Sequence, residues 1–228
     1  MKNNEHAPKV FLLGDSIIDN GPYVGTMPAV TDEVKKRWPN HVERVAYDGH
    51  RMLEVDQQYD DAIAAGFNPA QDVLVLSVMG NDLRVMLGVY EQPVKTVAEG
   101  MVTAYRHIEQ VFARYDALVA SIRARGVKHL VLVSIYPIYD MSLYAGERVN
   151  FNVNERTGSW VLMTPVLGMV ARHIIDTAKK HGAEVAELFS GDFGPEDIVR
   201  SIEPGPSASP KVASIIVDAA KRCVGMMN

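Results

Sequence analysis

The sequence contains very little cysteine, since Cys223 is the only one among its 228 residues. A single cysteine excludes a disulfide within the chain and is compatible with a reducing compartment. Because Cys223 lies near the end of a predicted helix, we interpret it as a structural residue.

Long apolar runs are also missing from the sequence. No apolar stretch approaches the roughly 18 residues that indicate a membrane-spanning helix. The N-terminal residues 1–7 lack the apolar segment of a signal peptide and lead directly into a predicted strand. We therefore expect no membrane association and a cytoplasmic location.

The chain has no excess of positive charge. It contains 23 lysines and arginines against 28 aspartates and glutamates, a formal net charge of −5. Because nucleic-acid binding requires a basic surface, we expect no nucleic-acid partner. No pair of histidines shows metal-ligand spacing with a carboxylate, so we expect no metal site. The oligomeric state is unknown from the sequence.

What the sequence does contain is an alternation of strands and helices. Periodic helical segments separate five short apolar runs, and this pattern predicts a parallel sheet covered on both faces, a three-layer α/β/α fold. The length and the absence of repeats and linkers predict a single domain, residues 1–228. The predicted strands are residues 10–13, 42–46, 73–78, 130–133 and 183–188.

Two helix starts and one long loop are predicted in the second half of the chain. Thr164-Pro165 and Ser209-Pro210 each resemble an N-cap followed by a proline in the first helical turn. Residues 136–160 have no clean period, which is typical of a functional loop or lid. The aromatic residues of this loop would either line a substrate pocket or pack the loop against the rest of the domain. They are Tyr136, Tyr139, Tyr144 and Phe151.

Small polar turns follow three of the predicted strands: Gly14-Asp15-Ser16, Asp48-Gly49 and Gly80-Asn81-Asp82. In a parallel sheet these turns meet at the carboxyl edge, where ligands bind. Ser16 would attack a carbonyl there. The backbone N–H groups of Ser16 and Gly49 and the side-chain amide of Asn81 would stabilise the oxyanion. We interpret Asp15 and Asp82 as structural, because carboxylates readily accept hydrogen bonds from turn N–H groups.

At these turns the sequence resembles the SGNH, or GDSL-type, hydrolases. Gly14-Asp15-Ser16 matches the first block of the family, with Ser16 in the nucleophile's place. Gly49 matches the oxyanion glycine, and Gly80-Asn81-Asp82 matches the third block, with Asn81 as an oxyanion donor. The blocks occur in the family's order, and the resemblance covers nearly the whole chain. It implies a flavodoxin-like sheet order of about five strands, and ester hydrolysis without metal or cofactor.

The last block departs from the family pattern Asp-x-x-His-Pro, in which the histidine is the base and the aspartate orients it. Here the stretch reads Arg200-Ser-Ile-Glu203-Pro204, with Glu203 in the histidine's place and Arg200 in the aspartate's. Ile-Glu-Pro in this place resembles a bacterial branch of the family. A carboxyl with a pKa of about 4.3 matches a serine hydroxyl less well than an imidazole of about 6.5. Burial would raise the pKa of Glu203, whereas pairing with Arg200 would lower it.

His50 is the competing base, since it adjoins Gly49 and imidazole titrates near neutral pH. The sequence leaves open whether Glu203, His50 or neither accepts the proton of Ser16.

The predicted function is a serine esterase or acyl hydrolase with the site residues Ser16, Gly49, Asn81 and Glu203. A small-molecule ester, with an acetyl or short acyl group, is the expected partner, because the chain is small and lacks a strongly apolar lid. The alternative is a binding protein of the same fold that is catalytically weakened or inactive because it lost the usual histidine.

Overall fold

The computed structural model describes residues 8–85, 93–136, 153–199 and 202–226, with only the backbone described for residues 85 and 153–164. Its central sheet has five parallel strands in the order β2-β1-β3-β4-β5. This is the flavodoxin-like order, so the predicted fold class is confirmed. The strands are β1 (Val10–Gly14), β2 (Val42–Arg44), β3 (Val73–Ser77), β4 (His129–Val133) and β5 (Glu184–Ala186).

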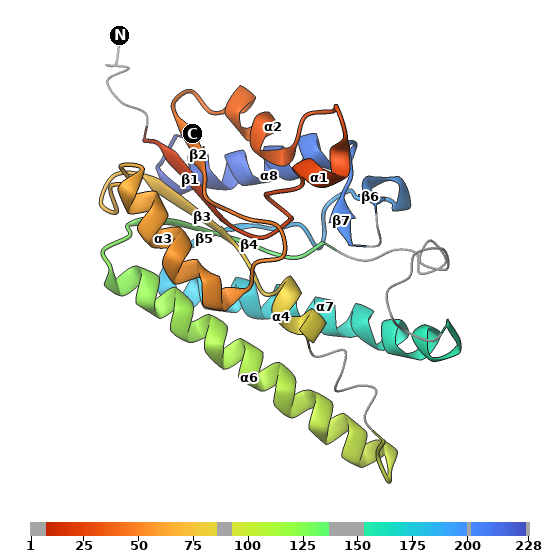
Figure 1. Cartoon of the computed structure of the whole chain (residues 1–228). Coiled ribbons are helices and arrows are strands. Elements are labelled where there is room, and N and C mark those ends of the chain that lie inside the picture. The colour runs from red at the N-terminus through yellow and green to blue at the C-terminus, as the bar shows by residue number, and fades with distance from the viewer. Residues whose placement is uncertain (1–7, 86–92, 137–152, 200–201, 227–228) are drawn as a thin grey trace.

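Helices lie on both faces of this sheet (Figure 1). One face is covered by α2 (Val30–Arg37) and α8 (Ala208–Cys223). The other is covered by α3 (Val55–Ala64), α6 (Val97–Ala124) and α7 (Val153–His181). Among the described helices, none combines the length and the apolar character needed to cross a membrane.

The strands are uninterrupted apolar runs because both faces of the sheet are buried. In β1, Val10 and Leu12 belong to the core beneath α2 and α8, whereas Phe11 and Leu13 belong to the core beneath α3, α6 and α7. All four side chains are at most 1% exposed. β3 divides its side chains between the same two cores, so β1 and β3 are held firmly at the centre of the sheet.

Helix α7 begins earlier than predicted. It starts at Val153, so Thr164-Pro165 lies inside the helix and its prediction as a helix start is wrong. A proline in a helix interior costs roughly 3 kcal/mol, which is why the local sequence favours a start there. A helix of 29 residues tolerates one missing hydrogen bond. The rest of the predicted lid, residues 137–152 with Tyr139, Tyr144 and Phe151, lies outside the described residues.

Helix α8 also starts away from the predicted position. It begins at Ala208 with Ser207 as its N-cap, so the prediction of Ser209 as the cap is wrong. Pro210 is still tolerated, because the first N–H groups of a helix have no acceptor within it. Ser209 is instead a fully buried residue of the first turn, where its hydroxyl bonds to neighbouring segments.

Several short elements were not predicted. The polar loop before α8 contains β6 (Ile198–Val199) and β7 (Glu203–Pro204), which pair antiparallel. Strands of two residues are too short to show a period in the sequence. The other short elements are α1 (Gly21–Val24), η1 (Met52–Glu54), α4 (Gly80–Val85) and η3 (Pro195–Asp197).

Candidate active site

Ser16 lies in the turn that follows β1, at the carboxyl edge of the sheet. Gly14 makes this turn possible. Its φ is +134°, and a Cβ atom at this position would lie 1.9 Å from the carbonyl oxygen of Ser77 on β3. Only glycine satisfies both conditions. The N–H of Asp15 then donates to the same Ser77 carbonyl at 3.0 Å, which joins the turn to β3 and leaves Ser16 7% exposed.

The Asp15 carboxylate holds the Ser16 turn together. Its Oδ1 accepts hydrogen bonds from the Ile17 N–H and the Ser77 hydroxyl, both at 3.1 Å. The side chain is buried, and burial raises the pKa of Asp15 to about 7 against the opposing effect of these two bonds. The negative charges of Glu203 and Asp82 raise it further. Glu203 therefore lies within electrostatic range of the residue next to Ser16.

A second set of contacts joins the turns after β2 and β3. The Asn81 Nδ2 donates to the carbonyl of His50 at 2.9 Å, and the N–H of Met52 donates to Asp82 at 3.1 Å. Gly49 has a φ of +78°, which lets the chain turn sharply just before His50. The Asn81 amide carries a second hydrogen on Nδ2 besides the one in this bond. The three predicted turns thus meet at one edge of the sheet.

Gln58 of α3 links the turns after β1 and β2. Its Oε1 accepts from the Gly14 N–H at 2.7 Å, and its Nε2 donates to the Gly14 carbonyl at 2.8 Å. The same Nε2 lies 2.8 Å from Nδ1 of His50. The side chain is 2% exposed, so these bonds are made out of contact with water. Gln58 therefore fixes the backbone two residues before Ser16 together with the His50 ring.

Glu203 reaches the site from the other end of the chain. It is the first residue of β7, pairs with Val199 of β6, and is 6% exposed. The hydroxyl of Tyr136 donates to the carbonyl of Ile202, the residue before it. Arg200, which stands in the place of the family's aspartate, lies outside the described residues. The structure thus brings the Glu203 segment to the Ser16 side of the sheet.

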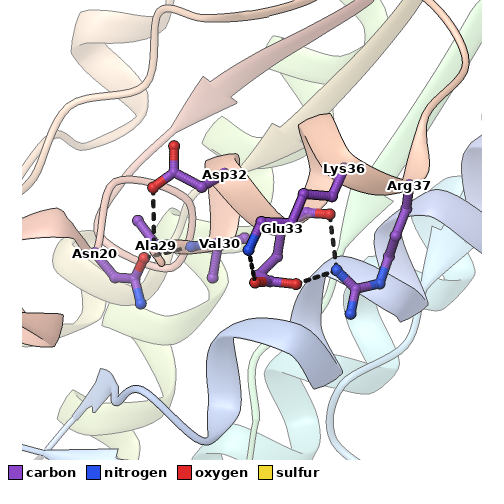
Figure 2. A network of polar contacts seen from close by, with 7 residues as sticks. All are labelled: Asn20, Ala29, Val30, Asp32, Glu33, Lys36 and Arg37. Atoms are coloured by element: carbon purple, nitrogen blue, oxygen red, sulfur yellow. Dashed lines mark hydrogen bonds and ion pairs between the residues drawn. The ribbon is translucent and has the colours of Figure 1, made fainter. Parts of the chain in front are cut away.

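Asn20 connects the Ser16 turn to the Glu203 segment. Its Nδ2 donates to the carbonyl of Pro204 at 2.9 Å and to the hydroxyl of Ser209 at 2.8 Å. Its Oδ1 accepts from the N–H of Val30, the first residue of α2, at 2.8 Å (Figure 2). Asn20 is fully buried, so all three bonds are shielded from water. One side chain therefore holds β7, α8 and α2 at the end of the Ser16 turn.

A partly buried ion pair supports the Glu203 segment. Asp197 is 0% exposed and accepts from the Lys211 ammonium of α8 and from the N–H of Gly194, both at 2.8 Å. Its carbonyl accepts from the N–H of Gly205 at 2.7 Å. These bonds close the loop that carries β6 and β7 onto α8.

Asp19 is not available for chemistry at Ser16. One of its carboxylate oxygens pairs with the Arg44 guanidinium, and the other accepts from the N–H of Asp48 at 3.0 Å. Asp19 thus ties the Ser16 turn to the segment after β2.

Asn20 and Gln58 are the residues of this region that sequence reasoning missed. A signal existed for Gln58, because it lies between Val55 and Tyr59 on the buried face of a predicted helix, where an amide requires partners. Asn20 follows the Gly-Asp-Ser turn closely, but nothing in the local sequence indicates its partners 184 and 189 residues away.

Within the described part of the chain, no group of three histidine, cysteine or acidic side chains is arranged to hold a metal ion. A cleft of about 380 Å³ lies between η1 and α6 and is bordered by Asp82, Arg51 and Arg114. Ser16, Gly49, Asn81 and Glu203 do not line it, so it is separate from the candidate active site.

No protein-family model matches the sequence, and no curated protein matches it at the sequence level. Solved structures do match. A phospholipase A1 from Streptomyces albidoflavus NA297 aligns with a TM-score of 0.63 at 18% identity, covering 94% of this chain and 100% of that one. A protein from Parabacteroides merdae described as a GDSL-like lipase aligns with a TM-score of 0.64 at 15% identity, covering 96% and 97%.

An acetylxylan esterase from Geobacillus stearothermophilus also aligns, with a TM-score of 0.57 at 13% identity over 96% of this chain and 94% of that one. At such identities the likeness concerns the fold. The chain has the SGNH-hydrolase fold, so the resemblance carried by its sequence blocks is confirmed at that level.

Proposed function

We propose that this chain is a serine esterase that hydrolyses a small ester through an acyl-enzyme on Ser16. The observation that carries the proposal is the hydrogen bonding between the strand-end turns, from Asp15 to Ser77 and from Asn81 to His50. Acyl transfer needs a nucleophile and oxyanion donors at one fixed point, and these bonds hold the turns that would supply them. The fold shared with lipases and esterases supports the same reaction.

In the first half of the proposed reaction, Ser16 Oγ attacks the ester carbonyl and its proton moves to the Glu203 carboxylate. The carbonyl oxygen becomes an oxyanion that accepts from the N–H groups of Ser16 and Gly49 and from Asn81 Nδ2. Each such donor lowers the activation barrier by about 3 to 4 kcal/mol. The intermediate then expels the alcohol, which takes the proton back from Glu203, and the acyl group stays on Ser16.

In the second half, water attacks the acyl-enzyme and gives a proton to Glu203. The oxyanion forms at the same donors, the Ser16 oxygen leaves, and Glu203 returns the proton to it. The products are the free acid and the regenerated enzyme.

Glu203 is the proposed base because of its surroundings. Its side chain is 6% exposed, and a buried carboxylate is a stronger base than an exposed one. Its charge contributes to the raised pKa of Asp15, which adjoins the nucleophile. We propose a short acyl group as the substrate's acid portion, because the chain is small and lacks a strongly apolar lid sequence.

The second candidate function is a binding protein that retains the fold but does not hydrolyse its ligand. Glu203 in the place of the family's histidine is the observation that favours it. Such a protein would bind esters at the same edge of the sheet without forming an acyl-enzyme.

Reaction with a fluorophosphonate probe and hydrolysis of p-nitrophenyl acetate separate the two functions. We expect the full-length protein to do both and Ser16→Ala to do neither. Ser190→Ala, at an exposed serine, is the matched control and is expected to behave as wild type. A wild-type protein that neither reacts with the probe nor exceeds background hydrolysis would contradict the esterase proposal.

The role of Glu203 requires its own variant. Glu203→Gln removes the basic oxygen at nearly constant volume and is expected to lower kcat roughly 10²–10⁴-fold, the usual contribution of a general base. Glu196→Gln, an exposed change a few residues earlier, is the control. Full activity in Glu203→Gln would exclude Glu203 as the base without excluding Ser16 as the nucleophile.

A further inference from the structure

The contact between Gln58 and His50 determines where the His50 ring carries its proton. The N–H of Gly14 can only donate and its carbonyl can only accept, so the Gln58 amide is oriented with Oε1 toward the former and Nε2 toward the latter. Gln58 Nε2 therefore presents its second N–H to Nδ1 of His50, 2.8 Å away. Nδ1 is the acceptor in this bond, and the neutral ring then carries its proton on Nε2.

A histidine in this form donates at Nε2 and has no lone pair there with which to accept a proton. If Nδ1 took up a proton as well, that N–H would point at the N–H of Gln58, and neither group could accept from the other. The ring also lies against Tyr47, with 5.0 Å between the ring centroids, and the backbone carbonyl of His50 accepts from Asn81. The bond from Gln58 to Nδ1 argues against His50 as the base that activates Ser16.

We propose that Gln58 is a positioning residue that holds His50 as an Nε2–H donor beside Gly49, where it hydrogen-bonds an acceptor oxygen of the bound ester. This inference rests on the esterase proposal for the same site. It assigns to His50 the binding of the substrate and leaves the proton of Ser16 to another group. It also favours esters with a second oxygen acceptor close to the scissile carbonyl.

The tautomer can be measured on the full-length protein without any substrate. Long-range proton–nitrogen NMR spectra distinguish Nε2–H from Nδ1–H imidazole, and the His50 signals are assigned by their loss in His50→Gln. We expect the Nε2–H form in wild type and a mixture of both tautomers in Gln58→Met. An Nδ1–H ring in wild type would overturn the proposal.

The donor role is tested by comparing two substitutions of His50. Glutamine places an amide N–H close to where Nε2–H lies but has no basic nitrogen. We expect His50→Ala to lower kcat/KM for p-nitrophenyl acetate about tenfold, the value of one hydrogen bond of about 1.4 kcal/mol, and His50→Gln to recover most of that loss. His41→Gln, at the opposite edge of the sheet, is the control.

The outcomes separate this inference from the esterase proposal. An active wild type in which His50→Gln is as impaired as His50→Ala would overturn the donor role alone. An inactive wild type with no probe labelling at Ser16 would overturn both. If Gln58→Met fails to fold, the two His50 variants still test the donor role. His50 is only partly buried, so these substitutions should leave the protein folded.

Discussion

The two sides of the candidate site are built in different ways. The nucleophile side consists of the turns after β1, β2 and β3, and short bonds join them directly, such as Asp15 to Ser77 and Asn81 to His50. The Glu203 side consists of β6 and β7, which belong to a separate two-stranded sheet. It is held from outside by Asn20, by Tyr136 and by the Lys211–Asp197 ion pair.

The two sides differ in the contacts that position their residues. The nucleophile side depends on glycine backbone geometry and on the register between two buried strands, β1 and β3. The Glu203 side depends on a few side-chain contacts, among them the Asn20 amide, whose partner Pro204 lies 184 positions away. We expect backbone strain to disrupt the nucleophile side. The loss of single side-chain contacts should disrupt the Glu203 side.

The largest effect is expected for Gly14→Ala. The added Cβ would lie 1.9 Å from a backbone oxygen of β3, and φ is +134°, so β1 and β3 would have to separate. We expect the free energy of unfolding in urea to fall by more than about 4 kcal/mol, which is exceptional for one substitution. Hydrolytic activity should fall with it.

Gly49→Ala is the matched control for this strain. Gly49 also has a positive φ, +78°, but a Cβ there would meet no atom within 4 Å. We expect a loss of only about 1–2 kcal/mol, the usual cost of a left-handed residue. Equal losses in the two variants would show that the close contact with Ser77 does not govern the turn.

The second prediction concerns Asn81→Ala, which removes a donor from the nucleophile side without straining the backbone. We expect kcat for p-nitrophenyl acetate to fall roughly 10²–10³-fold. The free energy of unfolding should fall by about 1 kcal/mol, the value of the bond to the His50 carbonyl. Unchanged kcat in a folded variant would remove Asn81 from the proposed oxyanion site.

Much of the nucleophile side could be predicted from the sequence because its determinants are local. The apolar runs of β1 and β3 identify buried strands, and each small polar turn follows a strand directly. Parallel strands bring such turns to one edge, so the sequence predicts Ser16, Gly49 and Asn81 close together. Their catalytic roles stay predictions until the variants are measured.

The Glu203 side could be predicted only in part, because its determinants are distant in the chain. The sequence places Glu203 in the family's last block, just before the final helix. Strands β6 and β7 are too short to show a pattern in the sequence. Ser209 resembled a helix cap locally, yet it is a buried partner of Asn20. Gln58 was not predicted as part of the site, because its partner Gly14 lies 44 residues away.

The third prediction tests the Glu203 side through Asn20→Ala. The change leaves the Val30 N–H and the Pro204 carbonyl buried without their partner, which should cost about 3 kcal/mol of unfolding free energy. We expect kcat to fall about tenfold or more with little change in KM, because Glu203 adjoins Pro204. Amide hydrogen exchange should rise in the β6 and β7 segments.

Ser209→Ala removes only one of the three partners of Asn20 and is the control for that variant. A loss of about 1 kcal/mol and near-normal kcat are expected. If Asn20→Ala destabilises the protein but leaves kcat unchanged, then the Glu203 segment does not depend on Asn20 for its position.

The smallest effect is expected where the two sides interact electrostatically, at Asp15. Its pKa is raised from an ordinary 3.8 to about 7, mainly by burial and further by the charge of Glu203. Between these values the folded chain holds a proton that the unfolded chain has lost. The contribution of Asp15 to the free energy of unfolding therefore falls as the pH rises from about 4 to about 7 and is constant above that.

Asp15→Asn removes this titration while its Oδ1 can still accept from Ile17 and Ser77. Relative to wild type, the variant should gain about 3 kcal/mol of unfolding free energy between about pH 5 and about pH 8. Asp60→Asn, at an exposed position of α3, should keep the wild-type pH dependence.

The single variant Glu203→Gln should weaken the pH dependence that Asp15 causes, because one charge that raises the pKa of Asp15 is then gone. Parallel pH dependences in wild type and Asp15→Asn would mean that the pKa of Asp15 is not raised in the folded protein.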